Sequence, residues 1–137
     1  MLVSVNRLRR AVERNEGQAL VEFALILPIL LVLIMGIIEF GRIFFSYLVI
    51  TELAREGARY GVVGHTEQQI VEHLEGMASV LDPEKLVIDV TPNDGERVRG
   101  QGLTVEIDYT VDLIGPFIGA LLPDPFPVVA SCTMRLE

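Results

Sequence analysis

A long apolar run near the start is the first clear pattern of hydrophobic and polar positions along this chain. Residues 23–38 carry no charge, and Glu22 is the one charged residue between positions 19 and 38. About twenty residues of α-helix extend roughly 30 Å, which matches the hydrocarbon thickness of a bilayer. We therefore expect residues 18–38 to cross a membrane as a helix.

The helical pattern continues past this run. Apolar residues recur three and four positions apart as far as Tyr60, and no proline interrupts them after position 39. Gly61 is a residue of the kind that ends helices. The pattern predicts one helix over residues 18–61, in which residues 39–61 pack under a small head. Small residues at positions 54, 58 and 61 would let this part lie close to a sheet.

Pro28 lies inside the apolar half of the predicted helix. A proline removes one backbone donor and clashes with the carbonyl four residues earlier, which predicts a kink or a locally melted turn. Membrane helices also tolerate proline for packing reasons alone, so the residue by itself leaves both interpretations open.

The pattern of residues 62–137 predicts a small head with one short helix and several strands. Thr66 and Gln69 form a capping box that opens a short helix to about Leu81. The apolar stripe of this helix consists of Ile70, Val71, Leu74, Met77, Ala78 and Leu81. Strands are expected over residues 86–91, 103–113 and 128–136, and a proline-rich loop over residues 115–127, with a short turn at residues 118–121, joins the last two.

The middle strand alternates apolar and polar residues, which predicts one packed face and one wet, acidic face. The fold class is therefore α+β: a long N-terminal transmembrane helix continues into a small head with a short helix and an antiparallel sheet of about three strands.

The charges are distributed as unevenly as the apolar residues. Residues 1–17 contain four arginines and two glutamates, whereas the rest of the chain carries a net charge of -10. Arginines just before an apolar span favour retention of that end in the cytoplasm. We expect a basic cytoplasmic leader over residues 1–17 and an extracytoplasmic head over residues 62–137. Nothing in the acidic head resembles a basic patch for nucleic acid.

Glu22 needs an explanation because a carboxylate inside an apolar span is costly and is usually paired or functional. A bland alternative is that its side chain reaches the inner headgroups beside Arg14. The apolar run and the charge alone leave both interpretations open.

Other candidate chemistry is weak. His65 and His73 lie eight positions apart with no cysteine between them, which is poor evidence for a metal site. The alternating carboxylates Glu106, Asp108 and Asp112 suit a solvated strand that discourages further pairing better than they suit calcium. Cys132, the single cysteine, predicts a buried thiol in a strand. No nucleophile with a base and no phosphate loop is recognisable, so we expect no enzymatic activity, metal or cofactor.

Three segments together carry a family resemblance: GQALVEFALILP at residues 17–28, GIIEFGR at residues 36–42 and AREGAR at residues 54–59. They resemble the TadE-like family of minor pilins and pseudopilins of tight-adherence (Flp, type IVc) pilus systems. The family motif covers residues 17 to about 60. The final residues 132–137, CTMRLE, also look like the closing strand of TadE-type heads.

The resemblance implies cleavage by a prepilin peptidase between Gly17 and Gln18. Glu22 and Phe23 would then serve peptidase recognition and assembly, with Glu22 pairing to the α-amine of its own or a neighbouring subunit. Cleavage would place that amine about one helical turn from the carboxylate, in a low-dielectric setting that penalises an unpaired charge. The further motif residues Glu39, Gly41 and Arg42 fall at the expected outer membrane boundary.

For Glu39 and Arg42, simple anchoring of the helix at that boundary is an open alternative.

The implied partners are the prepilin peptidase, other pilin subunits of a Tad/Flp pilus, the inner-membrane assembly platform and the lipid bilayer. The implied location is the plasma membrane, single-pass, and after processing an extracellular pilus. The expected function is that of a structural minor pilin. The alternative is an uncleaved single-pass anchored protein whose acidic head binds an envelope or secretion component.

Overall fold

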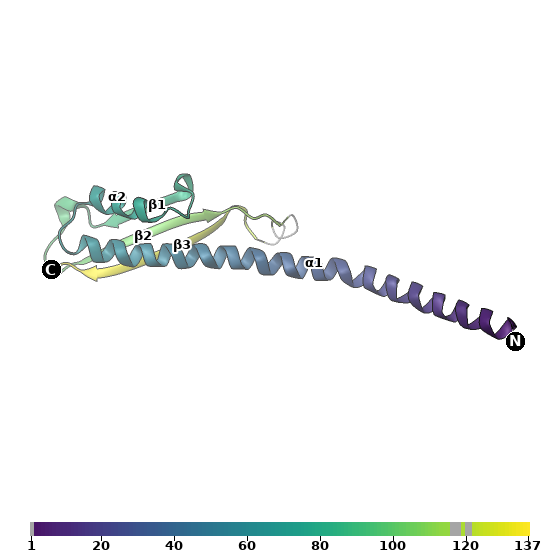
Figure 1. Cartoon of the computed structure of the whole chain (residues 1–137). Helices are drawn as coiled ribbons and strands as arrows, with labels where there is room; N and C mark the ends of the chain where they lie inside the picture. The colour runs from purple at the N-terminus through teal and green to yellow at the C-terminus, as the bar shows by residue number, and fades with distance from the viewer. Residues whose placement is uncertain (1, 116–118, 120–121) are drawn as a thin grey trace. The chain divides into compact units, whose positions relative to one another are not determined.

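The computed structural model describes residues 2–115, 119 and 122–137, and it has the predicted α+β fold (Figure 1). Its helices are α1 (Leu2–Gly61) and α2 (Glu67–Met77), and its strands are β1 (Leu86–Thr91), β2 (Gly102–Val111) and β3 (Phe126–Arg135). Single 3-10 turns precede β1 and β2 at Pro83–Lys85 and Asp94–Glu96. The short turn predicted at residues 118–121 lies, except for Gly119, outside the described residues. The chain divides into two compact units between Ile38 and Glu39.

The first unit is the N-terminal part of α1. The helix begins at Leu2, earlier than the predicted residue 18, because residues 2–16 contain no proline or glycine that would stop it. It continues as α-helix on both sides of Pro28, without a melted turn, and the kink stays a prediction. From Gly17 to Gly61 the helix is long and apolar enough to cross a membrane.

The second unit contains a three-stranded antiparallel sheet in the order β1-β2-β3. β1 has the predicted bounds, whereas β2 ends at Val111, two residues before the predicted end. The backbone N–H of Leu113 instead donates to the Asp124 carboxylate, which takes it out of the strand ladder. β3 begins two residues earlier than predicted and includes Pro127, which an edge strand tolerates because one side of it needs no donor.

The core of the second unit lies between the helices and one face of the sheet. Its fully buried residues come from four elements: Ile50 and Ala58 on α1, Ile70 and Leu74 on α2, Val90 on β1, and Leu103, Val105 and Ile107 on β2. A Cβ atom added to Gly57 would lie 2.7 Å from Leu74 Cδ1, and one added to Gly61 would collide with Leu103 and Ile70. The predicted close approach of α1 to the sheet is therefore confirmed, with Gly57 as a further small residue that the sequence analysis missed.

The predicted capping box of α2 is confirmed. The Thr66 hydroxyl accepts from the Gln69 backbone N–H at 3.3 Å, and the Gln69 side-chain oxygen Oε1 accepts from the Thr66 backbone N–H at 3.0 Å. The predicted end at Leu81 is wrong: the helix stops at Met77, one residue after Gly76, a poor helix former. Met77 is therefore half exposed rather than part of the buried stripe. On β3, Cys132 is only partly buried.

Candidate functional site

The first group of candidate residues lies on α1 at the start of the apolar run. The Gln18 side-chain amide donates to the Glu22 carboxylate at 3.1 Å, since residues four apart share a helix face. Both side chains are exposed, as is Phe23. A Cβ added to Gly17 would meet no atom within 4 Å, so the helix surface is open at this point. The structure thus brings Gln18 and Glu22 together and leaves the peptide before them accessible.

Large apolar side chains cover the helix from this point to the end of the first unit. More than half of the surface of Leu25, Ile29 and Leu33 is exposed, and the most apolar part of the helix has no buried residue. Pro28 lies in the middle of this surface. A helix that is apolar all round requires lipid or other protein around it.

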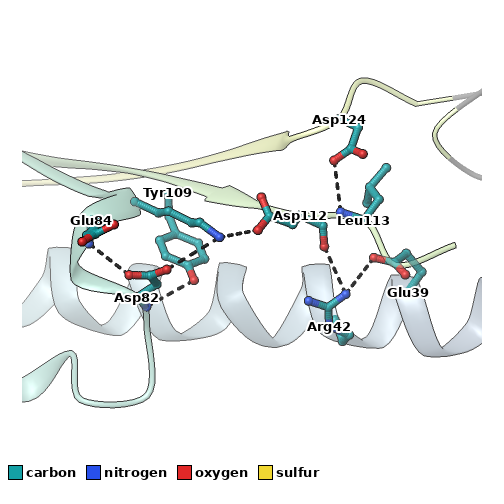
Figure 2. A network of polar contacts seen from close by, with 9 residues as sticks. Glu39, Arg42, Asp82, Glu84, Tyr109, Asp112, Leu113 and Asp124 are labelled. Atoms are coloured by element: carbon teal, nitrogen blue, oxygen red, sulfur yellow. Dashed lines mark hydrogen bonds and ion pairs between the residues drawn. The ribbon is translucent and has the colours of Figure 1, made fainter. Parts of the chain in front are cut away.

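The second group, Glu39 and Arg42, lies on the same helix at the start of the second unit and has a different environment (Figure 2). The Glu39 side chain is 3% exposed. Its Oε1 accepts from Arg42 Nη1 at 3.0 Å, and its Oε2 accepts from the backbone N–H of Ile114 at 3.1 Å. Arg42 Nη1 also donates to the backbone carbonyl of Asp112 at 3.1 Å. These two side chains therefore hold the segment that follows β2 against α1.

The network extends along β2 from Asp112. Lys85 pairs with the carboxylates of Asp112 and, at 3.6 Å, Asp82. The hydrogen bond from Lys85 to Asp112 raises the pKa of the lysine above its ordinary value. The Tyr109 hydroxyl accepts from the Asp82 backbone N–H at 3.4 Å (Figure 2). The i, i+3 spacing of Glu39 and Arg42 is visible in the sequence, whereas no local pattern links Glu39 to Ile114, 75 positions away.

Gly41 is not part of this network. A Cβ added there would meet no atom within 4 Å, so the structure leaves this motif residue on an open helix surface. The geometry thus separates Gly41 from Glu39 and Arg42, with which the sequence motif groups it.

Comparison with protein families connects both groups. The family described as TadE-like protein matches residues 17–59. This segment is TadE-like. The resemblance expected from the sequence is therefore confirmed over the part of α1 that includes Glu22, Pro28, Glu39 and Arg42. Comparison with curated proteins and with solved structures found no significant match.

The match to TadE-like protein, together with the long apolar helix, indicates a membrane protein related to Tad pili. The TadE-like segment ends in the part of α1 that packs on the sheet, where it carries two exposed ion pairs. Arg55 pairs with Glu52 at 3.3 Å, and Arg59 holds Glu56 through two hydrogen bonds of 2.9 and 2.7 Å. The hydrogen bond from Arg59 lowers the pKa of Glu56 below its ordinary value, with His73 as a weaker contributor.

The rings of His65 and His73 stack on the ring of Tyr60. The ring centroid of Tyr60 is 3.6 Å from that of His65 and 4.3 Å from that of His73, with the planes nearly parallel. His65 Nδ1 lies 2.8 Å from the Tyr60 carbonyl, and this contact requires a proton on that nitrogen. Within the described residues, no group of three or more His, Cys, Asp or Glu side chains could hold a metal ion.

Proposed function

We propose that this chain is a noncatalytic structural subunit, a minor pilin or pseudopilin, of a tight-adherence type IVc pilus. The observation that carries the proposal is an apolar TadE-like helix with Glu22 one turn after an accessible Gly17–Gln18 peptide. The helix anchors the precursor in the plasma membrane, and the acidic head lies outside. The unequal charges of the leader and the head support this orientation.

The first step is removal of residues 1–17 by a prepilin peptidase. Two observations support cleavage between Gly17 and Gln18: a Cβ added to Gly17 would meet no atom within 4 Å, and Gln18 is exposed. Cleavage removes the arginines that hold the leader in the cytoplasm and makes Gln18 the first residue. The apolar helix stays with the head.

The second step is pairing of charges between subunits. The Gln18 side chain already reaches Glu22, so a new ammonium group on Gln18 would arise on the same helix face as the carboxylate. In an apolar surrounding, two opposite charges that meet are favoured over two that stay unpaired. Pairing of Glu22 with the ammonium of a neighbouring subunit would therefore set the axial register of the assembled helices.

The third step is exchange of lipid for protein around the helix. Large apolar side chains on all sides of residues 18–38 pack against the helices of other pilin subunits without a strict sequence requirement. The inner-membrane assembly platform would extract the processed subunit from the bilayer.

Purification of sheared pili tests the proposal. A tagged chain expressed in a cell with a tight-adherence system should appear in the filament fraction at a low ratio to the major subunit. The matched control is the same strain without prepilin peptidase, in which the chain should remain in the membrane fraction. Retention of the chain in the membrane of both strains would favour the alternative, an uncleaved anchored protein whose head binds an envelope or secretion component.

A further inference from the structure

A second apolar surface lies on the head, at the end of the second unit that contains Glu39. Phe40 and Phe44 are 69% and 50% exposed, and their rings stack with centroids 6.2 Å apart. Ile114 is 64% exposed, and Leu122 is also exposed. Because its N–H donates to Glu39, Ile114 lies beside the turn of α1 that carries Phe40, and exposed apolar residues close together mark an interaction surface.

Hydrogen bonds fix Leu113 and Ile114 in place. The Glu39 carboxylate accepts from the backbone N–H of Ile114, and the Asp124 carboxylate accepts from that of Leu113 at 3.2 Å. Ile114 is therefore held beside Glu39 although the two are 75 positions apart in the sequence. Glu39 in turn follows Ile38, the last residue of the apolar run, directly in the chain.

Three carboxylates near this surface have hydrogen-bond partners: two are in ion pairs, and that of Asp124 accepts from the Leu113 N–H. Glu39 binds Arg42, and Asp112 binds Lys85. Paired and hydrogen-bonded charges cost less to bring toward an apolar medium than single ones. The surface can therefore approach lipid although the head as a whole is acidic.

We propose that Phe40, Phe44, Ile114 and Leu122 dock into the interface of the bilayer, and that the head thereby makes a second membrane contact in addition to its spanning helix. The argument for lipid as the occupant is continuity: the surface begins at Phe40, two positions after Ile38, the last residue of the apolar run, so the inference rests on the membrane span of the proposed function. The contact depends on burial of apolar area, because the excess of carboxylates in the head gives no attraction to anionic lipid. It depends neither on cleavage nor on pilus assembly.

The absence of tryptophan from the chain makes the test direct. The variant Ile114→Trp reports on the proposed contact. Val63→Trp is a matched control, since Val63 is 65% exposed and lies two residues after the C-terminal end of α1. Each uncleaved full-length variant is reconstituted in phosphatidylcholine vesicles. Its fluorescence is measured with acyl-brominated lipid and with acrylamide in the aqueous phase as quenchers.

Ile114→Trp should emit at shorter wavelength than Val63→Trp and be quenched several-fold more by brominated lipid. Equal quenching of the two variants by brominated lipid, with both open to acrylamide, would overturn the proposal. A blue-shifted Ile114→Trp that brominated lipid does not quench would overturn it as well, in favour of a second copy as the occupant. Leu122→Trp is subject to the same expectations and replaces the first variant if its circular dichroism shows misfolding.

Discussion

At the scale of single residues, two carboxylates on one helix have opposite environments. Glu22 is exposed and its described hydrogen bond is to Gln18. Glu39 is buried and accepts from a guanidinium and from a backbone N–H of its own chain. Because the chain itself satisfies Glu39, Glu22 is the better candidate of the two for a charge on another subunit.

Replacement of Glu22 by glutamine should preserve processing and membrane insertion but lower incorporation into filaments, because glutamine cannot form the charge pair. The measurement is the ratio of variant to wild type in sheared pili from a strain that expresses both. Glu52→Gln, at an exposed position where the carboxylate pairs with Arg55, is the control and should be incorporated normally. Equal incorporation of all three chains would contradict the pairing of Glu22.

Replacement of Glu39 by alanine should destabilise the head. It removes the acceptor of the Ile114 N–H and one of the two acceptors of Arg42, which keeps the Asp112 carbonyl, and a hydrogen bond to a charged group contributes about 1.5–3 kcal/mol. The free energy of unfolding of the detergent-solubilised chain measures the effect. Glu52→Ala removes only a surface ion pair and should cost about 0–1 kcal/mol. A head equally stable in both variants would refute the role of Glu39.

Stability should also fall in acid through Glu56. Arg59 lowers the pKa of Glu56 from its ordinary value of 4.5, so the folded state binds this proton less readily than the unfolded state. The resulting stabilisation is complete above the unfolded pKa and is lost as the pH falls through the folded pKa. Arg59→Gln should therefore lower the melting temperature at pH 7 and reduce its decline below a pH of about 4.5. An equal fall in the melting temperature of variant and wild type between pH 7 and a pH below about 4.5 would argue against a stabilising Arg59–Glu56 pair.

At the scale of elements, glycines decide how α1 packs on the head. Gly57 and Gly61 face Leu74, Val105 and Leu103 so closely that a methyl group does not fit. Small residues at these positions let the helix approach the sheet, and the buried side chains of α2 fill the space beside it.

Gly57→Ala should destabilise the head by about 1–3 kcal/mol, because the added methyl group overpacks the core. Gly76→Ala in α2 is the control: an added Cβ there meets no atom within 4 Å, and alanine should stabilise the helix by up to about 1 kcal/mol. Denaturant unfolding of the full chain in detergent distinguishes the two. A Gly57 variant as stable as the Gly76 variant would be incompatible with the close contact to Leu74.

Local patterns predicted the elements better than their ends. The capping box at Thr66 and the alternation in β2 are properties of neighbouring residues, so the sequence alone revealed them. The end of α2 at Met77 follows a weak helix former, Gly76. The end of β2 at Val111 depends on the Leu113 N–H, which donates to Asp124, 11 positions further along the chain. For the same reason, the hydrogen bond from Ile114 to Glu39 could not be predicted, whereas the spacing of Glu39 and Arg42 and the Gly17–Glu22 motif could.

At the scale of the whole molecule, one helix serves two purposes. Residues 39–61 supply a face of the head's core, and residues 18–38 present an apolar surface that the chain itself does not cover. The proposed function requires the second part to remain attached to the head while the arginines before it are removed. Cleavage at Gly17 is thus the step on which the account depends.

Mass spectrometry of the chain, extracted from membranes of a cell that contains a prepilin peptidase, tests this step most directly. The account predicts a mature N-terminus at Gln18, with or without a methyl group on its amine, and retention of the leader in the variant Gly17→Leu. A wild-type chain that keeps residues 1–17 in such a cell would contradict it.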